Sequence, residues 1–298
     1  MTLPSKRSGA TSLAEPLMMW FEPRRRAYPW RGTSDPYAVL VSEVMLQQTQ
    51  VARVVPAFER FLSRFPTVGA LAHASRADVV RAWDGLGYNR RAVALSEAGR
   101  AIVRDHGGRV PADPEELKRL PGVGPYTAAA IASFAYGATI AAVDTNVRRV
   151  VARVRLGREP GEVRRDTIDD EAGRWLDRRH PAEWNQALMD LGREVCRPEP
   201  RCEACPIAAD CRARSTSRHS RLAQRRAAPF EGSMRQVRGG VVNVLRRGAA
   251  SVGELAAETG FPVERIVDAI GALVRDGLVV ADAAARAGRP TGRVRLAD

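Results

Sequence analysis

Residues 120–124 read Leu-Pro-Gly-Val-Gly and join two segments with helical character, 114–119 and 125–136. Gly122 and Gly124 allow the backbone to turn tightly and to bring its N–H groups close to an anion. The second segment would also present the positive end of a helix to that anion. The pattern therefore predicts a helix-hairpin-helix that binds the phosphate backbone of a nucleic acid without reading its sequence.

The same residues could form an ordinary glycine-rich turn between two helices. Three neighbouring features favour a nucleic-acid partner instead. Arg119 precedes the turn, Pro125 suits the first position of a helix, and small residues, Ala-Ala-Ala-Ile-Ala-Ser, follow at 128–133. In addition, 47 Lys and Arg residues stand against 34 Asp and Glu residues, which gives a net charge of +13. A chain of this charge is expected to bind a polyanion, most simply nucleic acid.

The chain as a whole has the composition of a folded protein outside the membrane. Hydrophobic residues make up 45% of its 298 positions, and this length is sufficient for two domains. No apolar run approaches the roughly 18 residues that a membrane span requires. The N-terminal residues 1–12 lack the apolar core of a signal peptide. We therefore expect a cytoplasmic protein without a membrane partner.

Glu43 lies in a segment, residues 35–50, whose apolar residues have helical spacing. Its helical neighbours at i−4, i−3 and i+3 are Val39, Leu40 and Leu46. A carboxyl that loses its solvation in this way has a raised pKa and keeps a proton near neutral pH, as a general acid requires. A glutamate on a solvated polar face is the ordinary alternative, and the apolar neighbours argue against it.

Asp144 is the second candidate carboxylate and stands in Val-Asp-Thr-Asn-Val-Arg-Arg-Val, residues 143–150. It precedes a short helical segment and can accept a backbone hydrogen bond as its N-cap. Because capping and the positive helix end both favour a charged carboxylate, we expect Asp144 to be ionised. A neutral acid and an ionised carboxylate form the pair that cleavage of a glycosidic bond requires. The alternative is that Asp144 caps the helix and does nothing more.

The four cysteines lie within sixteen residues, at Cys196, Cys202, Cys205 and Cys211. Disulfides are not expected in the cytoplasm, so this clustering predicts a single metal site. Four thiolates suit a tetrahedral zinc ion or a [4Fe-4S] cluster, and the spacing does not distinguish the two. A single Cys-x2-Cys pair with a five-residue gap on each side predicts one compact loop around the metal.

Changes in composition divide the chain into four regions. Residues 1–12 are expected to form a disordered tail, residues 13–212 a mostly helical region, and residues 213–235 a basic linker. In residues 236–298 the apolar spacing predicts three helices followed by a small hairpin. That order is typical of a winged helix.

Several motifs together resemble the MutY family of adenine DNA glycosylases, and they occur in matching order over residues 13–212. The resemblance implies an all-α, helix-hairpin-helix glycosylase fold with two lobes, a six-helix lobe at about 36–137 and a cluster lobe made of 13–35 and 138–212. It also implies that the cysteines hold a [4Fe-4S] cluster. Besides the cysteine loop, the motifs are Tyr-Pro-Trp-Arg at 28–31, Ser-Glu-Val-Met-Leu-Gln-Gln-Thr-Gln at 42–50, Gly-Leu-Gly-Tyr at 85–88, Leu-Pro-Gly-Val-Gly-Pro-Tyr-Thr-Ala at 120–128, Val-Asp-Thr-Asn-Val-Arg-Arg-Val at 143–150 and Asn-Gln-Ala-Leu-Met-Asp-Leu-Gly at 185–192.

The resemblance implies roles for four residues in the reaction. Glu43 would protonate the adenine ring, and Asp144 would stabilise the sugar cation. Tyr126 and Asn146 would help to shape that site. The family removes adenine that is mispaired with 8-oxoguanine or guanine and leaves an abasic site, so the partner would be double-stranded DNA with a mispaired adenine.

The resemblance also implies which residues contact the DNA. Trp30, Arg31 and Gln186 would line the pocket for the flipped base, and flipping costs a few kcal/mol of unstacking. Gln48 and Tyr88 would wedge into the stack that the base has left. The hairpin would bind the DNA backbone through Leu120, Gly122 and Gly124.

Strand cleavage by a glycosylase generally needs an amine that forms a Schiff base with the sugar. The related endonuclease III enzymes place a lysine in the helix after the hairpin, and Tyr126 occupies that place here. The chain has only Lys6, in the predicted tail, and Lys118, before the hairpin. We therefore expect a monofunctional glycosylase whose lyase activity is weak or absent.

The chain departs from the family in three places. The first cysteine gap holds five residues where the family usually has six, so the cluster loop must close more tightly. Asn89 follows Gly-Leu-Gly-Tyr where a second tyrosine is common. Residues 236–298 do not resemble the Nudix-like domain that typically recognises 8-oxoguanine. This segment could contact DNA through Arg286, Arg289 and Arg293, or it could pack against the catalytic lobe.

Two other functions fit parts of the sequence. A mismatch thymine or uracil glycosylase would share the fold and suit Tyr126, but pyrimidine enzymes often manage without an acid at the position of Glu43. A non-catalytic DNA-binding regulator, with the cluster as a redox sensor, would explain the charge and the winged helix but not Glu43 and Asp144. We expect a monomeric adenine glycosylase that is associated with the nucleoid.

Overall fold

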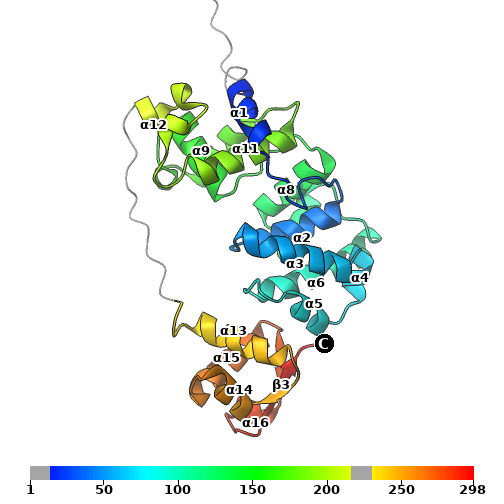
Figure 1. Ribbon diagram of the computed structural model, residues 1–298. Helices are drawn as coiled ribbons and strands as arrows, with labels where there is room; N and C mark the ends of the chain where they lie inside the picture. Colours follow the sequence, from blue (N-terminus) through cyan, green and yellow to red (C-terminus); the bar gives the residue numbers. More distant parts are fainter. Residues whose placement is uncertain (1–13, 216–229) are drawn as a thin grey trace, which may run out of the picture. The chain divides into compact units, whose positions relative to one another are not determined.

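The computed structural model describes residues 14–215 and 230–298, so the predicted tail and most of the predicted linker lie outside the described residues. Within these ranges the chain is mostly helical, and the strands lie near the C-terminus, as Figure 1 shows. The all-α prediction for the main region is therefore confirmed. The contacts group the described residues into two compact units, the first with 14–39, 112–115 and 124–215 and the second with 40–111, 116–123 and 230–298.

The first unit is built around α9 (Thr145–Leu156) and α11 (Pro181–Glu194), which pack against each other. Their backbones approach closely at Gly192, which has no side chain. A Cβ atom added there would lie 2.7 Å from the Cβ of Asn146. Trp175 and Trp184 meet edge to face in the core, with ring centroids 5.4 Å apart. The other elements of this unit are α1 (Ala14–Phe21), η1 (Glu22–Arg24), α8 (Pro125–Tyr136), η2 (Pro160–Glu162), α10 (Arg165–Trp175), η3 (Cys202–Ala204), η4 (Ala208–Asp210) and α12 (Arg212–Ser215).

The second unit contains a long buried helix, α6 (Arg90–His106), against which α4 (Val68–His73) and α5 (Arg76–Ala82) pack. Helix α3 (Val51–Arg64) adds Phe61, whose ring meets that of Trp83 edge to face at 6.0 Å. The division between the units falls within α2 (Pro36–Leu46) and α7 (Pro114–Lys118).

The C-terminal segment belongs to the second unit and forms three helices with a small antiparallel sheet of order β1-β3-β2. This arrangement confirms the predicted order of three helices followed by a hairpin. The structure adds one short strand before the second helix and one helical turn inside the hairpin. The elements are α13 (Met234–Leu245), β1 (Ala250–Ser251), α14 (Val252–Thr259), α15 (Val263–Arg275), β2 (Val279–Ala281), α16 (Ala283–Arg286) and β3 (Arg293–Leu296).

Helix α8 groups with the first unit, whereas the sequence placed it in the six-helix lobe at 36–137. The reason is its contact with α11 of the same unit. Asn185 Nδ2 donates to Ser133 Oγ at 3.0 Å, and the Tyr126 hydroxyl donates to the sulfur of Met189 at 3.9 Å. These contacts join residues more than 50 positions apart, which a local sequence pattern does not reveal. The domain boundaries proposed above remain a prediction.

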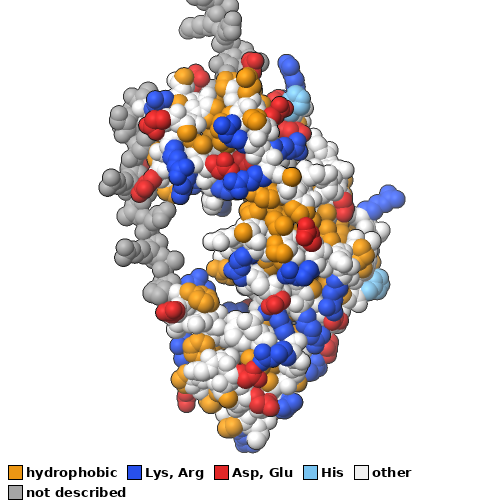
Figure 2. All heavy atoms as spheres, in the orientation of Figure 1, with side chains coloured by type: hydrophobic (Ala, Val, Ile, Leu, Met, Phe, Trp, Pro, Cys, Tyr) orange, Lys and Arg blue, Asp and Glu red, His pale blue; other side chains and the backbone are white. Residues whose placement is uncertain are grey.

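On the face that Figure 2 shows, basic and acidic side chains are interspersed over both units. This distribution follows from the excess of arginine in the composition. Among the described helices there is none with the length and apolar character of a membrane span.

Candidate active site and metal centre

Glu43 lies on α2 with only 5% of its surface exposed. The helical neighbours Val39 and Leu40 are buried as well, at 2% and 0%. Helix α2 begins after Asp35, whose Oδ1 accepts a hydrogen bond from the backbone N–H of Tyr37 at 3.0 Å. The predicted burial of this side chain is therefore confirmed.

Asp144 is the N-cap of α9, as predicted. Its Oδ1 accepts from the backbone N–H of Val147 at 2.7 Å, and its Oδ2 accepts from Asn146 Nδ2 at 2.9 Å. Its carboxyl is also buried, which the sequence does not show. Burial of the Asp144 carboxyl raises its pKa, and this cost outweighs the hydrogen bonds and the charge of Arg149, which lower it. The sequence shows the cap but not the depth at which the cap is buried.

Helix α11 gathers most of the other candidate residues of the first unit. Arg31 donates two hydrogen bonds of 2.8 Å to the carboxylate of Asp190, a geometry that fixes the guanidinium plane. Tyr126 contacts Met189 on the same helix. Gln186 is 9% exposed, and its Oε1 is buried without a hydrogen-bond partner among the described residues. A buried, unsatisfied amide oxygen is an acceptor available to a polar ligand.

Trp30 adds an aromatic surface near this group. Its ring stacks on that of Tyr28, with centroids 5.3 Å apart and planes inclined by 17°. The guanidinium of Arg31 also lies over the Tyr28 ring, 5.0 Å from its centroid. The Tyr-Pro-Trp-Arg motif therefore folds into a stack of planar groups that α11 holds through Asp190.

Arg149 connects Asn146 to the cysteine loop. Its Nη2 donates to Asn146 Oδ1 at 2.9 Å and to the carbonyl of Gly192 at 2.7 Å. Its Nε donates to the carbonyl of Cys196 at 2.7 Å. Asn146, which donates to Asp144, is thus held by an arginine that is itself bonded to the cysteine loop. We did not identify Arg149 or Asp190 from the sequence, although both lie inside quoted motifs.

Gln48 and Tyr88 share an unusual backbone conformation in the second unit. They are the only non-glycine residues among the described ones with left-handed φ angles, 57° and 45°. This region is unfavourable for side chains with a Cβ atom and persists only where the surroundings impose it. Tyr88 is also 47% exposed, which is high for a large aromatic residue. Strained, exposed side chains of this kind are typical of binding loops.

Arg91 on α6 is the residue that holds both loops. Its Nη1 donates to the carbonyl of Gln47 at 2.6 Å, and its Nη2 donates to Thr49 Oγ1 at 2.8 Å and to the carbonyl of Gly87 at 3.2 Å. Its guanidinium also lies 5.6 Å from the ring centroid of Tyr88. Burial lowers the pKa of Arg91 to about 10, so it remains charged at neutral pH. Sequence analysis missed Arg91 because its acceptors are mostly backbone carbonyls, which carry no sequence signal.

The hairpin has the predicted form between α7 and α8. Gly122 adopts a left-handed φ of 78°, and Gly124 is the N-cap of α8 with an ordinary φ of −89°. Leu120 is 4% exposed, so a contact of this residue with DNA would involve its backbone rather than its side chain. The carbonyl of Gly122 accepts a hydrogen bond from Gln47 Nε2 at 3.3 Å.

The two hairpin glycines allow a matched pair of substitutions. We expect Gly122→Ala to destabilise the protein by roughly 1–3 kcal/mol, since alanine disfavours a left-handed φ and its Cβ would lie 2.9 Å from the Cβ of Ala94. Gly124→Ala is the control, because its φ is ordinary and a Cβ there would meet no atom within 4 Å. Thermal unfolding measures both effects. Equal destabilisation by the two variants would contradict this account of the turn.

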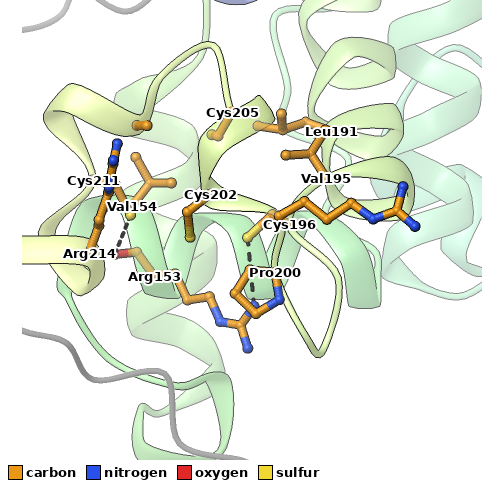
Figure 3. Close-up of a pocket in the computed structure, with 12 residues that line it drawn as sticks. Arg153, Val154, Leu191, Val195, Cys196, Pro200, Cys202, Cys205, Cys211 and Arg214 are labelled. Carbon is orange, nitrogen blue, oxygen red and sulfur yellow. Dashed lines mark hydrogen bonds between the residues drawn. The ribbon is translucent and has the colours of Figure 1, made fainter.

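The four cysteines line one pocket, which Figure 3 shows together with part of α9. Cys196 is buried, and the other three are partly exposed. Among the described residues, no cluster of His, Cys, Asp or Glu side chains is arranged as metal ligands, although the four cysteines line the same pocket. Burial raises the pKa of the Cys205 thiol to about 11. Thiolates in this pocket therefore need a nearby cation, and four sulfur donors on one loop fit a thiolate-binding metal group.

Arg153 supplies positive charge beside this pocket. It is 2% exposed and pairs with Glu159 through hydrogen bonds of 2.9 and 3.1 Å. Its Nη1 lies 3.8 Å from the sulfur of Cys196, and its Nη2 donates to the carbonyl of Pro198 at 3.0 Å. Arg153 therefore fixes the start of the cysteine loop to α9. Sequence analysis did not identify it, because its partners in the cysteine loop lie more than 40 positions away.

Comparison with known proteins assigns the chain to a family. The model of the HhH-GPD superfamily of base excision DNA repair proteins matches residues 41–168, which include Glu43, the hairpin and Asp144. The adenine DNA glycosylase of Mycobacterium tuberculosis is 45% identical over 255 residues, which cover 84% of this chain and 80% of that protein. The chain belongs to the adenine DNA glycosylase family. The family predicted from the motifs is thereby confirmed.

Solved structures support the fold of this adenine DNA glycosylase family member. A thermostable thymine-DNA glycosylase matches with a TM-score of 0.65 and 28% identity, over 70% of this chain and 97% of that one. An endonuclease III in a non-covalent complex with DNA matches with a TM-score of 0.58 over 72% of this chain and all of its own length. Its identity is 22%, so this second likeness concerns the fold alone. The predicted helix-hairpin-helix glycosylase fold is confirmed.

Proposed function

We propose that this protein removes adenine from double-stranded DNA where the adenine is mispaired with 8-oxoguanine or guanine. The observation that carries the proposal is Glu43, a carboxyl buried among apolar side chains in a chain of the adenine DNA glycosylase family. Release of adenine needs a proton on the purine, and a shielded carboxylic acid can supply it at neutral pH. The protein would act as a monomer on the DNA of the nucleoid.

The reaction would proceed through a sugar with oxocarbenium character. Glu43 would donate its proton to a ring nitrogen of adenine, which makes the base a neutral leaving group. Asp144 would stabilise the positive charge that develops on the sugar, and water would complete the hydrolysis. The hydrogen bond from Asn146 and the α9 cap hold the Asp144 carboxylate in place before the reaction. Preorganisation of this kind avoids rearrangement in the transition state.

The base would be recognised by polar and planar groups of the first unit. Gln186 offers a buried amide oxygen without a partner, which suits the amino group of adenine. The stack in which Trp30 and Arg31 each lie against Tyr28 offers planar groups for a flipped base. Tyr126 would help to close the pocket from α8.

The duplex would be held by the second unit and the hairpin. Gln48 and Tyr88 would fill the space that the flipped base leaves, and their fixed left-handed backbones suit this role. Exposed N–H groups at Gly122 and Gly124 would bind phosphate.

We also propose that Cys196, Cys202, Cys205 and Cys211 hold a [4Fe-4S] cluster. Four thiolate donors and the adjacent Arg153 fit such a group. A bound cluster would supply structural cross-linking of the loop. No step of base release would involve it.

The substrate is tested with labelled duplexes that carry A, T or U opposite guanine or 8-oxoguanine. After incubation with the enzyme and alkali treatment, we expect strand breaks at A opposite either purine and none at T or U. Preferential breakage at T or U would favour the second candidate function, a mismatch pyrimidine glycosylase. That candidate draws support from the likeness to a thymine-DNA glycosylase.

The absence of a lysine after the hairpin predicts the fate of the abasic product. Tyr126 stands at that place, and neither Lys6 nor Lys118 lies in the helix that follows the hairpin. We therefore expect borohydride to trap little or no covalent enzyme–DNA complex, and strand breaks to require added alkali. Efficient trapping with the wild-type enzyme would contradict a monofunctional reaction. A Tyr126→Lys variant, assayed in parallel, tests whether an amine at this position is sufficient for trapping.

A further inference from the structure

Arg246, at the C-terminal end of α13, fastens the C-terminal segment to the rest of the second unit. Its side chain is 11% exposed. Its Nη1 donates to Asp84 Oδ1 at 2.6 Å, its Nη2 to Asn89 Oδ1 at 3.0 Å, and its Nε to the carbonyl of Val80 at 3.2 Å. In return, Arg81 donates to the carbonyl of Arg246 at 3.4 Å. The partners belong to the end of α5 and to the loop between α5 and α6.

That loop is the one that carries Tyr88. Gly85, Gly87 and Tyr88 all have left-handed φ angles. Glycine adopts this conformation readily, whereas Tyr88 does so at a cost and depends on outside contacts to keep it. Arg91 on α6 holds this loop through the carbonyl of Gly87. Arg246 holds its other end through Asn89, the residue that follows Tyr88 and that departs from the family pattern.

A second residue of the C-terminal segment contacts Tyr88 itself. Arg235 Nη1 donates to the Tyr88 hydroxyl at 3.4 Å. A separate contact lies at α5, where Arg76 donates to the carbonyl of Gly277 at 3.2 Å. The segment is therefore attached at several points, and two of them fall on Tyr88 and its neighbour.

The charges of the C-terminal segment argue against binding of the DNA phosphates as its main role. Residues 230–298 carry ten arginines against eight acidic residues, so they contribute little of the net charge of +13. Several of these arginines pair within the segment, including Arg293 with Glu254 at 3.4 Å and Arg295 with Asp298 at 2.5 Å. Arg293 was one of the three arginines that we considered for DNA contact.

We propose that the C-terminal segment acts on DNA through Tyr88, with Arg246 as the positioning residue. By bonding to Asp84 and Asn89, Arg246 keeps the loop in the conformation that presents the Tyr88 ring. An aromatic ring held in this way stacks on bases without first losing conformational freedom. This inference rests on the proposed DNA-binding role of Tyr88.

The test compares Arg246→Ala with Arg247→Ala. Arg247 is the adjacent residue, but its side chain is 66% exposed and pairs with Glu258 of the same segment. The measured quantity is Kd for a duplex with a tetrahydrofuran abasic analogue opposite 8-oxoguanine. We expect Arg246→Ala to raise this Kd by about tenfold and Arg247→Ala by less than about twofold, because only the first removes hydrogen bonds to the loop. Equal effects would overturn the proposal.

A double-mutant cycle shows whether Arg246 acts through Tyr88. We expect Arg246→Ala to change Kd by less than about twofold in a Tyr88→Ala background, since the group it positions is absent. If the rise in Kd of the double variant equalled the product of the two single rises, the proposal would be overturned, because Arg246 would then act by a route other than Tyr88. The rate of base release at saturating enzyme should change little in Arg246→Ala.

Two controls keep the result interpretable. Asn89→Ala removes one acceptor of Arg246 without altering the C-terminal segment, and we expect about a threefold rise in Kd that also disappears in the Tyr88→Ala background. If Asn89→Ala left Kd unchanged, the proposed route through the loop would be wrong. The duplex with the abasic analogue contains no adenine at the site. Failure of the wild-type enzyme to release adenine would therefore reject the proposed function, whereas the Kd comparison would still test the role of Arg246.

Discussion

Glu43→Gln is expected to slow adenine release by about a thousandfold, within the range of roughly 10²–10⁴ that general acid catalysis contributes. Glutamine has nearly the same shape as glutamic acid and fits the buried position on α2. Its amide cannot deliver a proton to the purine ring. The base would then have to leave as the adenine anion, which is a much poorer leaving group than neutral adenine. The effect should fall on the chemical step.

The measurement is the single-turnover rate of alkali-labile site formation at saturating enzyme. Kd for the duplex with the abasic analogue should change by less than about threefold, since the carboxyl is assigned to the reaction and not to DNA binding. Glu59→Gln is the matched control, because it removes an exposed carboxylate from α3 of the same unit. Retention of rapid adenine release by Glu43→Gln would remove the basis of the proposed function.

Asp144→Asn is expected to slow adenine release by about 10²–10³-fold, the cost of losing one preorganised electrostatic partner of the transition state. The amide oxygen of asparagine can still accept from the backbone N–H of Val147, so the α9 cap is retained. The substitution therefore separates the charge of Asp144 from its capping role. Asp144→Ala removes both and should in addition cost about 1 kcal/mol of stability.

The pH dependence provides an independent check of Asp144. The reaction needs the ionised carboxylate, and burial raises the pKa of Asp144 above its ordinary value of 3.8. The rate should therefore fall as the pH drops through this raised pKa, at a higher pH than for an exposed aspartate. In Asp144→Asn this acid limb should be absent, whereas Asp169→Asn, which removes a partly exposed carboxylate paired with Arg148, should retain it. An unchanged acid limb in Asp144→Asn would assign it to another group.

The local motifs of the sequence were sufficient for several parts of the candidate site. Glycine at 122 was predictable because few other residues adopt a left-handed φ without strain. Asp144 was predictable as a cap because it stands directly before a helical segment. The burial of Glu43 followed from apolar residues one helical turn away. In each case the deciding interaction lies within about four residues along the chain.

Other parts of the site depend on partners that are distant in the sequence. Arg91 was missed because it binds backbone carbonyls more than 40 positions away, and Asp190 because its partner Arg31 is 159 positions away. The rise in the pKa of Asp144 was not predictable for the same reason, since the burial of its carboxyl is set by packing and not by the cap.

The sequence determined the helical periodicities, the turn, the caps and the clustering of the cysteines, because short-range sterics and hydrogen bonding fix these features. Only the tertiary structure showed which arginines hold which loops, that α8 belongs with α11, and that the C-terminal segment bonds to the loop of Tyr88. The physical reason is that burial and long-range hydrogen bonds arise from packing between segments, and a backbone acceptor looks the same at every position of the sequence.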